Sequence, residues 1–271
     1  MTGKPHLSYS SLTSWLDCGE RYRLERVVGV TQSPAWWFLG GSAVHTATEL
    51  HDIGDAAPAV DLFHVAWTKE RARIDAPDSA FRSGGRRVSK DWPNKENDAW
   101  WLHHGPLMVQ SWIDWRVNNP QWQILDIAGQ SEDGRDERPG IEVPFQLAYG
   151  DTQIQGYIDR VMVNTDTGQV SVVDIKSGSR DPASALQLGV YSRGLAQQYG
   201  LTATIGAYWM ARRGDLGHTH SLLHFTDDRL AAWFGKAKVG IENEVFIPHV
   251  TSFCNTCAVA PHCVAVGGVA P

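Results

Sequence analysis

The spacing of apolar residues in the first half of the chain is helical. In the opening segment Leu12, Trp15 and Leu16 recur with a period close to that of an α-helix, and similar spacing returns further along. The pattern predicts helices over residues 8–26, 40–53, 59–75 and 95–118. Gly105 and Pro106 lie inside the last of these, and we expect them to kink or split it.

From Trp122 onward the period changes to two, which is typical of strands. Strands are predicted over residues 122–127, 141–149, 153–164 and 169–176. Turn residues at 149–151 and 165–168 favour antiparallel pairing of these strands. A helix begun by Asp181 is then predicted over 181–199. The remaining elements are strands over 203–212 and 218–225 and a helix over 226–244. The mixture predicts an α/β fold.

Composition sets the broad class of the protein. At 271 residues and 42% hydrophobic content, the chain can form one elaborated domain with a buried core. It has no run of 18 apolar residues and no signal-peptide pattern after Met1, so we expect a cytoplasmic protein with no membrane contact. Thiols stay reduced in the cytosol, and the four cysteines are therefore expected to bind metal or lie buried. The net charge of −6 is compatible with an enzyme that has a local basic groove.

Two carboxylates and a lysine stand on two adjacent predicted strands, Asp159 on the first and Asp174 with Lys176 on the second. Because side chains alternate along a strand, Asp174 and Lys176 project from the same side. Mg²⁺ and Mn²⁺ prefer oxygen ligands and keep several waters. The two aspartates are therefore candidate metal ligands, and the lysine is placed to act on a metal-activated water.

Two further groups are candidates to complete this metal site, the backbone carbonyl of Ile175 and the ring of His45. His45 shares a helix face with Glu49, four residues away. We leave Glu49 outside the site, and also Glu142, which begins a strand. The alternative reading is structural: Asp159 and Arg160 form an ion pair, and the second strand carries solvated charges.

Four short segments resemble, in order and spacing, the motif series of the RecB-like branch of the PD-(D/E)XK nuclease superfamily. They are Gly41–His45, Gly156–Arg160, Val173–Gly178 and Gln187–Tyr191. The resemblance implies a restriction-endonuclease-like core, with a central mixed sheet flanked by helices. It also implies that His45, Asp159 and Asp174 bind metal and that Lys176 is the catalytic lysine. Asp174 departs from the glutamate that the family often has there, but both residues chelate metal.

Gln187 and Tyr191 fall on the family's Gln-x3-Tyr motif, which lies beside the active site and helps to position the lysine or the DNA. The same spacing is also found on ordinary amphipathic helix faces. The resemblance therefore adds both residues to the catalytic set formed by Asp159, Asp174 and Lys176.

The cysteines follow the pattern Cys254-x2-Cys257-x5-Cys263, with Cys18 far upstream. This pattern resembles the signature of iron-sulfur nucleases of the CRISPR-associated exonuclease and AddB type, including phage-encoded relatives. That resemblance implies a [4Fe-4S] cluster held by four thiolates. A zinc site is the alternative that the chemistry leaves open, with His262 able to replace one thiolate. Buried cysteines without metal are a further alternative.

The resemblance divides the chain into a mainly helical portion over 1–120, a nuclease core over 121–245 and an iron-sulfur tail over 246–271, within one integrated domain. It implies a metal-dependent DNA exonuclease that acts on single-stranded DNA or DNA ends in recombination, repair or CRISPR-type adaptation, alongside proteins of those pathways. The alternative is a non-catalytic DNA-end-binding or adaptor protein. Two basic groups are candidate DNA contacts: Arg82, Arg86, Arg87 and Lys90 beside Trp92, and Arg21, Arg23 and Arg26.

Overall fold

The computed structural model describes residues 7–84, 95–127 and 139–271 and divides into two compact units. The first, here called the sheet unit, comprises Pro34–Pro144 and Tyr157–His224. The second, the terminal unit, comprises Met1–Ser33, Phe145–Gly156 and Phe225–Pro271. Each unit is assembled from segments that are far apart in the sequence. No helix in the described ranges is long and apolar enough to cross a membrane.

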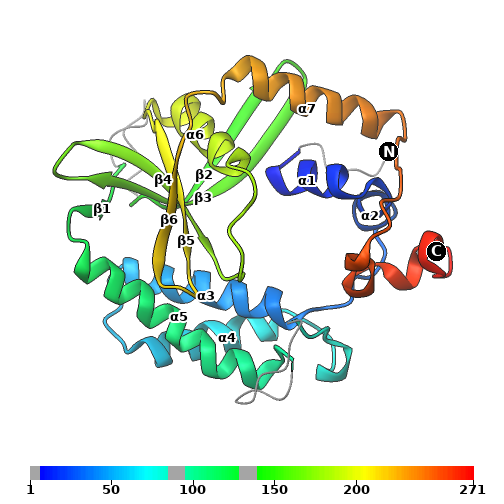
Figure 1. Ribbon diagram of the computed structural model, residues 1–271, viewed down its shortest axis with the longest axis horizontal. Helices are drawn as coiled ribbons and strands as arrows, with labels where there is room; N and C mark the ends of the chain where they lie inside the picture. Colours follow the sequence, from blue (N-terminus) through cyan, green and yellow to red (C-terminus); the bar gives the residue numbers. More distant parts are fainter. Residues whose placement is uncertain (1–6, 85–94, 128–138) are drawn as a thin grey trace. The chain divides into compact units, whose positions relative to one another are not determined.

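A curled mixed sheet is the frame of the sheet unit (Figure 1). The strands of this sheet are β1 (Trp122–Ile124), β2 (Ile141–Tyr149), β3 (Thr152–Asn164), β4 (Gln169–Lys176), β5 (Ile205–Met210) and β6 (Asp215–Ser221). The parts of β2 and β3 within Phe145–Gly156 belong to the terminal unit. The order is β1-β3-β4-β5-β6, and β2 also pairs with β3. β4 is antiparallel to β3 and parallel to β5, so a crossover is needed between β4 and β5. The helix α6 (Leu186–Tyr199) makes it.

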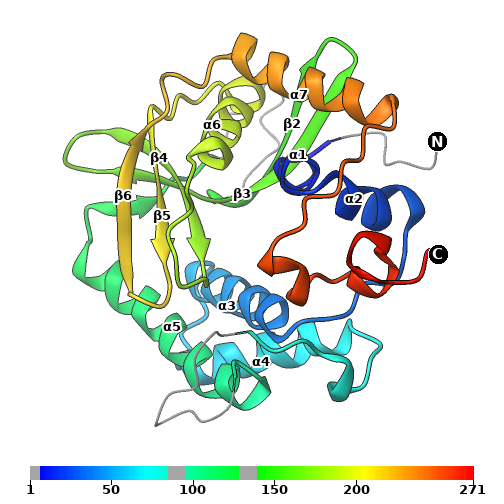
Figure 2. The same cartoon turned by 45° about the vertical axis from the view of Figure 1, so that its right-hand side comes forward.

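Alternation along β4 assigns its two faces to different helices. Val173 and Ile175 belong to a core cluster with α3 (Trp36–Asp52), α4 (Ala59–Ala72) and α5 (Asp98–Asn118). Asp174 lies between these two residues in the strand and therefore faces the other side, where α6 contacts β4 (Figure 2). The predicted central mixed sheet flanked by helices is thus confirmed.

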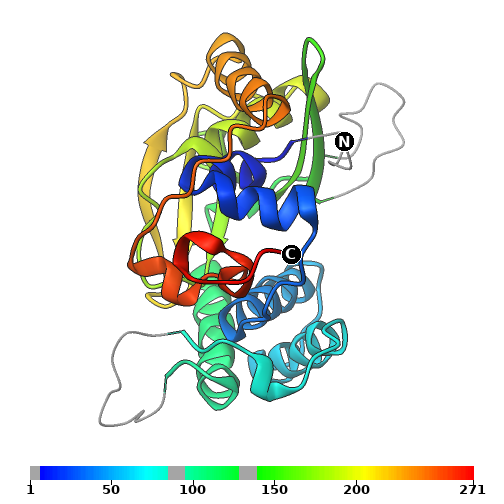
Figure 3. The same cartoon turned by 90° about the vertical axis from the view of Figure 1, so that its right-hand side faces the viewer.

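The terminal unit contains α1 (Tyr9–Asp17), α2 (Gly19–Tyr22), a π-helical segment (Arg23–Val28) and α7 (Asp227–Glu242). The C-terminal tail consists of short 3-10 turns and lies beside α1 and α2 (Figure 3). The indole N–H of Trp15 on α1 donates to the Val245 carbonyl at 3.0 Å, and the Tyr149 hydroxyl donates to Asp227 at 2.9 Å. These hydrogen bonds join the three segments of the unit.

Three predicted helices differ from the structure. The single helix expected over 8–26 is divided near Cys18, whose backbone is extended. The helix expected from Asp181 begins instead at Leu186, because the Asp181 carboxylate pairs with Arg213 at 2.7 Å and caps nothing. Pro106 does not split α5, which is one helix from Asp98 to Asn118, stabilised by its packing against α3 and α4.

Close approach of α3 to α5 depends on Gly40, since a Cβ there would overlap the ring of Trp101. We expect Gly40→Ala to destabilise the protein by about 1–3 kcal/mol, because the buried indole has to move. A matched control is Gly235→Ala on α7, where no atom lies within 4 Å of an added Cβ. That change should be neutral or stabilise by up to about 1 kcal/mol. Chemical denaturation measures both, and equal midpoints for the two variants would contradict the packing argument.

Candidate active site

One face of α3 carries a polar stripe toward the sheet. His45, Thr48 and Asp52 are spaced by three and four residues and therefore lie along the same side of the helix. The opposite side is apolar and packs into the core through residues such as Leu39 and Ala43. The helix is thus fixed by hydrophobic packing while its polar stripe faces β3.

Arg160 on β3 is fully buried and binds this stripe. Its Nε lies 2.7 Å from Asp52 Oδ2, its Nη2 donates to Thr48 Oγ1 at 3.2 Å, and its Nη1 donates to the Asp159 carbonyl at 2.7 Å. The indole N–H of Trp112 also donates to Asp52, at 3.1 Å. A buried ion pair needs such hydrogen bonds to offset its desolvation. The ion pair considered from sequence, between the Arg160 and Asp159 side chains, is not the one found.

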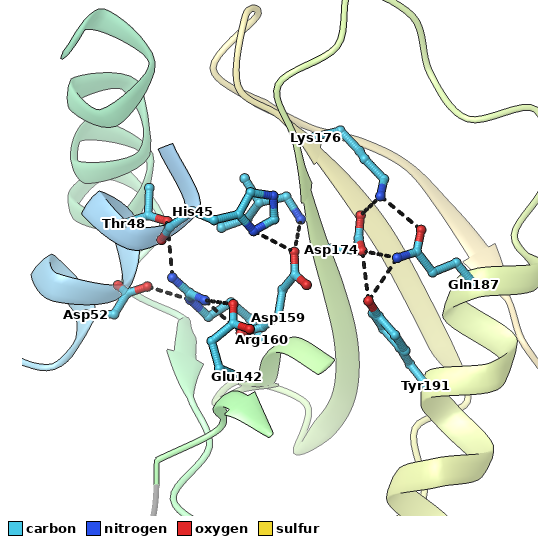
Figure 4. A network of polar contacts seen from close by, with 11 residues as sticks. His45, Thr48, Asp52, Glu142, Asp159, Arg160, Asp174, Lys176, Gln187 and Tyr191 are labelled. Carbon is cyan, nitrogen blue, oxygen red and sulfur yellow. Dashed lines mark hydrogen bonds and ion pairs between the residues drawn. The ribbon is translucent and has the colours of Figure 1, made fainter. Parts of the chain in front are cut away.

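His45, Glu142 and Asp159 bring ligand atoms together at the end of this stripe (Figure 4). These atoms all lie within 4.8 Å of one another, and His45 Nδ1 is 3.2 Å from Asp159 Oδ2. Glu142 is held there with a φ of 45°, a strained value for a residue with a side chain. One imidazole nitrogen and two carboxylates form a donor set that Mn²⁺ or Mg²⁺ can use, so the residues fit a divalent cation.

A second network occupies the neighbouring strand and α6. Lys176 Nζ lies 2.7 Å from Asp174 Oδ2 and donates to Gln187 Oε1 at 2.9 Å. The amide of Gln187 donates to Asp174 Oδ1 at 2.6 Å and to the Tyr191 hydroxyl at 2.8 Å. Tyr191 in turn donates to Asp174 Oδ1 at 3.2 Å. The lysine is therefore held by two partners, as Figure 4 shows.

Ile175 connects the two networks through its backbone. Its N–H donates to Asp159 Oδ2 at 2.9 Å, and His45 also makes a backbone hydrogen bond with Ile175. The residues that the sequence predicted for the metal and catalytic site therefore lie together in the sheet unit (Figure 4). Asp174 lies outside the tight three-residue group, since its oxygens contact Lys176, Gln187 and Tyr191.

Glu142 is the residue that sequence reasoning left out. It lies at the start of β2, with no local motif to mark it, and only the register of β2 beside β3 brings it to Asp159. Glu49, which was also left outside the predicted site, lines a cavity that includes His45 and Glu142 but is not one of the three grouped ligand residues.

The carboxyl groups of the site raise one another's pKa. Burial and the charge of Asp159 raise the pKa of Glu142 from 4.5 to about 8 and that of Asp174 from 3.8 to about 6. Burial also raises the pKa of Asp159, although the Ile175 N–H lowers it in part. Desolvation lowers the pKa of His45 from 6.5 to about 4, so its ring is neutral near pH 7. A group of crowded carboxyls beside a neutral imidazole is suited to bind a cation.

A cavity of about 600 Å³ opens at His45 and Glu142. Its wall includes Trp37 and Phe38 from the start of α3, and Ser177 and Gly178 from the end of β4. The cavity therefore gives the ligand group an approach within the sheet unit.

The four cysteines all lie in the terminal unit. The Cys18 thiol accepts the His249 N–H at 3.4 Å, and Cys254 Sγ lies 3.9 Å from the His249 carbonyl oxygen. Burial raises the pKa of the Cys257 thiol. In the described part of the chain, no three ligand atoms that include a cysteine sulfur lie within 4.8 Å of one another. The predicted cluster therefore stays a prediction.

The candidate DNA-contacting residues are only partly described. Arg82 lies over the Trp37 ring at 4.8 Å, Arg21 lies 3.6 Å from Asp17, and Arg23 pairs with Glu20 at 2.7 Å. The other members of the basic segment, Arg86, Arg87, Lys90 and the neighbouring Trp92, fall outside the described residues.

A sequence model of the PD-(D/E)XK nuclease superfamily matches residues 6–264, a span that includes both networks of the site. The chain belongs to this superfamily. Membership in the PD-(D/E)XK nucleases accounts for the mixed sheet and supports a nuclease function. The finer resemblance to the RecB-like iron-sulfur branch stays a prediction.

This PD-(D/E)XK nuclease is similar over most of its length to two phage proteins. It is 26% identical to the Gene 69 protein of Mycobacterium phage L5 over 90% of each chain, and 27% identical to the Gene 69 protein of Mycobacterium phage D29 over 96% of each. It is also similar to a solved Eubacterium rectale protein assigned as an exonuclease, with a TM-score of 0.47 and 11% identity over 93% of this chain and 87% of that one.

The raised pKa of Glu142 predicts proton release on metal binding. At pH 7 a carboxyl with a pKa of about 8 is mainly protonated, so binding of Mn²⁺ should displace about one proton and should strengthen as the pH rises. The raised pKa of Glu142 also adds to the free energy of unfolding of the metal-free protein. This contribution is fully present below pH 4.5 and is lost as the pH rises through about 8.

Calorimetry in buffers of different ionisation enthalpy measures this release. Glu142→Gln should release fewer protons, because it removes the titrating group and the charge that repels Asp159. The control is Glu70→Gln, whose carboxylate pairs with Arg73 at 2.7 Å and should not change the count. Wild-type proton release by Glu142→Gln would exclude Glu142 as a ligand.

Proposed function

We propose that this chain is a divalent-metal-dependent deoxyribonuclease that hydrolyses phosphodiester bonds. The observation that carries the proposal is the convergence of His45, Glu142 and Asp159 within 4.8 Å, beside a lysine held against Asp174. Nucleases of this superfamily need such a pairing of metal ligands with a lysine. The non-catalytic alternative gives no reason for the three crowded carboxyls of the site to be kept together.

Each residue has a proposed role. His45, Glu142 and Asp159 would bind the metal, and Asp174 with the Ile175 carbonyl would supply further oxygen ligands. When bound, Mg²⁺ or Mn²⁺ would stabilise negative charge on the phosphate and lower the pKa of a bound water.

Lys176 directs an N–H toward the attacking water. Gln187 orients Lys176 through the hydrogen bond at 2.9 Å and holds Asp174 through the one at 2.6 Å. Burial raises the pKa of Tyr191 well above 10, so its hydroxyl remains a donor to Asp174. Gln187 and Tyr191 thus position the two groups that act on the phosphate and the water.

We further propose that the enzyme is an exonuclease acting on single-stranded DNA or DNA ends, in the cytoplasm. The resemblance of its four motifs to RecB-like exonucleases supports this, and the same resemblance supports a role in recombination, repair or CRISPR-type adaptation. Recombination or CRISPR-adaptation proteins are the proposed partner classes.

A nuclease assay tests the catalytic assignment. With Mn²⁺ and end-labelled single-stranded DNA, we expect Lys176→Ala and Asp174→Ala to lower the cleavage rate by about 100-fold or more, because each loses a group that stabilises developing charge. Lys69→Ala, at an exposed position on α4, is the control and should cleave normally. Circular single-stranded DNA separates the modes, since an exonuclease leaves it intact. Equal cleavage by all variants would refute the assignment.

We also propose that Cys18, Cys254, Cys257 and Cys263 hold a [4Fe-4S] cluster in the terminal unit. Their common unit and the contacts of Cys18 and Cys254 with His249 support it. Sequence chemistry also permits a tetrahedral zinc site. The resemblance of the cysteine pattern to iron-sulfur nucleases is the reason that iron-sulfur is preferred over zinc.

Anaerobic purification tests the cluster. We expect brown protein with broad visible absorbance and about four irons per chain. Cys254→Ala should lose the colour and much of its solubility, while the protein that stays folded keeps Mn²⁺ binding at the catalytic site. Colourless wild-type protein with stoichiometric zinc would establish the zinc alternative instead.

A further inference from the structure

An aromatic pair lies at the start of α3, in the wall of the cavity that opens onto the ligand group. Phe38 is 63% exposed, which is high for a large apolar side chain, and its ring centroid is 5.8 Å from that of Trp37 at a tilt of 41°. Arg82 lies over the other ring, Trp37, at 4.8 Å. Single exposed apolar residues are common on protein surfaces. This pair differs because both rings line the same cavity as His45 and Glu142.

Helix geometry relates the pair to the ligand group. Phe38 and His45 are seven residues apart, so they lie on the same face of α3, separated by about 10 Å along its axis. That is the length of about three stacked nucleotides at about 3.4 Å each, or of fewer nucleotides in an unstacked strand. A strand whose phosphate lies at the ligand group therefore places a nearby base beside Phe38.

The charged side chains described in the cavity wall attract DNA phosphates only weakly. Stacking of DNA bases is therefore an important source of affinity for DNA. Among the described residues of its wall there are two arginines, and both are paired, Arg73 with Glu70 at 2.7 Å and Arg212 with Glu96 at 2.7 Å. Glu49 adds a further acidic side chain to the same wall. Phosphates gain little from paired arginines, whereas base–aromatic stacking contributes substantially and does not depend on sequence.

We propose that Phe38 and Trp37 form a stacking subsite for an unpaired base of the DNA strand being cleaved, so that the enzyme selects single-stranded ends. A base inside a duplex has both faces covered by its neighbours, and a terminal base is held by its pairing partner and by the neighbour on one face. Neither can enter such a subsite unless the duplex opens. The inference rests on the proposed nuclease function and identifies the feature of the site that selects its substrate.

Substitutions at Phe38 test the subsite, because its exposed ring can be changed without disturbing the core. On single-stranded DNA, Phe38→Ala and Phe38→Leu should each raise KM about tenfold or more with kcat nearly unchanged. Phe38→Trp retains a stacking ring and should restore KM. Cleavage of blunt duplex should be unaffected by all three. Leu107→Ala, at a position 54% exposed on α5, is the control and should behave as wild type.

A binding measurement separates failure of the subsite from failure of the nuclease function. Oligonucleotides with 2-aminopurine near the end are titrated with Lys176→Ala protein, which binds but does not cleave, in the presence of Ca²⁺. Stacking on Phe38 should quench the fluorescence of 2-aminopurine. Introducing Phe38→Leu into the Lys176→Ala protein should remove this quenching. If the wild type cleaves DNA and the Phe38 variants keep its KM and its quenching of the probe, the subsite is overturned and the nuclease function is not. An equal loss of cleavage by the Phe38 variants on single-stranded and on blunt duplex DNA also overturns the subsite. A wild type that quenches the probe but cleaves nothing overturns the nuclease function and leaves the subsite supported.

Discussion

The buried ion pair between Arg160 and Asp52 is the constraint on which the site depends. Arg160 is fully buried, and its guanidinium joins the helix that carries His45 to the strand that carries Asp159. Desolvation of both charges costs several kcal/mol, which the hydrogen bonds to Thr48, Trp112 and the Asp159 carbonyl must offset. Loss of either partner would leave the other with a longer ion pair, Asp52 with Arg116 at 3.6 Å or Arg160 with Glu142 at 3.7 Å. The relative position of α3 and β3 is therefore fixed before any metal binds.

With that position fixed, the fold brings together carboxyl groups that repel one another. The pKa of Glu142, Asp159 and Asp174 are all raised, so each is less readily ionised than it would be in water. Glu142 is in addition held at a strained φ. A divalent cation relieves the repulsion, because its charge favours the ionised carboxylates. The raised pKa values thus contribute to the preference of the site for a divalent cation.

The helix α3 organises both the chemistry and the approach to it. Its buried side packs in the core, its polar stripe holds His45 and Asp52, and its first turn presents Trp37 and Phe38 to the cavity. A single rigid element therefore sets the distance between the ligand group and the aromatic pair. In the proposed stacking subsite, helix geometry would set the position of the substrate relative to the metal ligands.

Relations within one element were readable from the sequence. Strand alternation placed Asp174 and Lys176 on one side, and helical spacing placed Gln187 one turn from Tyr191; both pairs are in contact. The predicted bounds of β2 and β4 match the structure. Burial alternates along β2, whereas β4 is buried on both faces over five consecutive residues. The motif series also pointed to the superfamily that the family match shows. Pattern and spacing are local properties, and so they determined these features.

Relations between elements were decided by the tertiary structure. Glu142 joins His45 and Asp159 only because β2 pairs with β3, and Arg160 finds Asp52 across 108 residues of sequence. Packing also overrode local signals, since Pro106 lies within one helix and Asp181 pairs with Arg213 instead of capping α6. The sequence by itself determined which side chains share a face and which chemistry they offer. Only the folded chain decided which of these faces meet. Burial of the apolar surfaces of α3, α4 and α5 against the sheet fixes where the polar side chains of these helices lie relative to the strands.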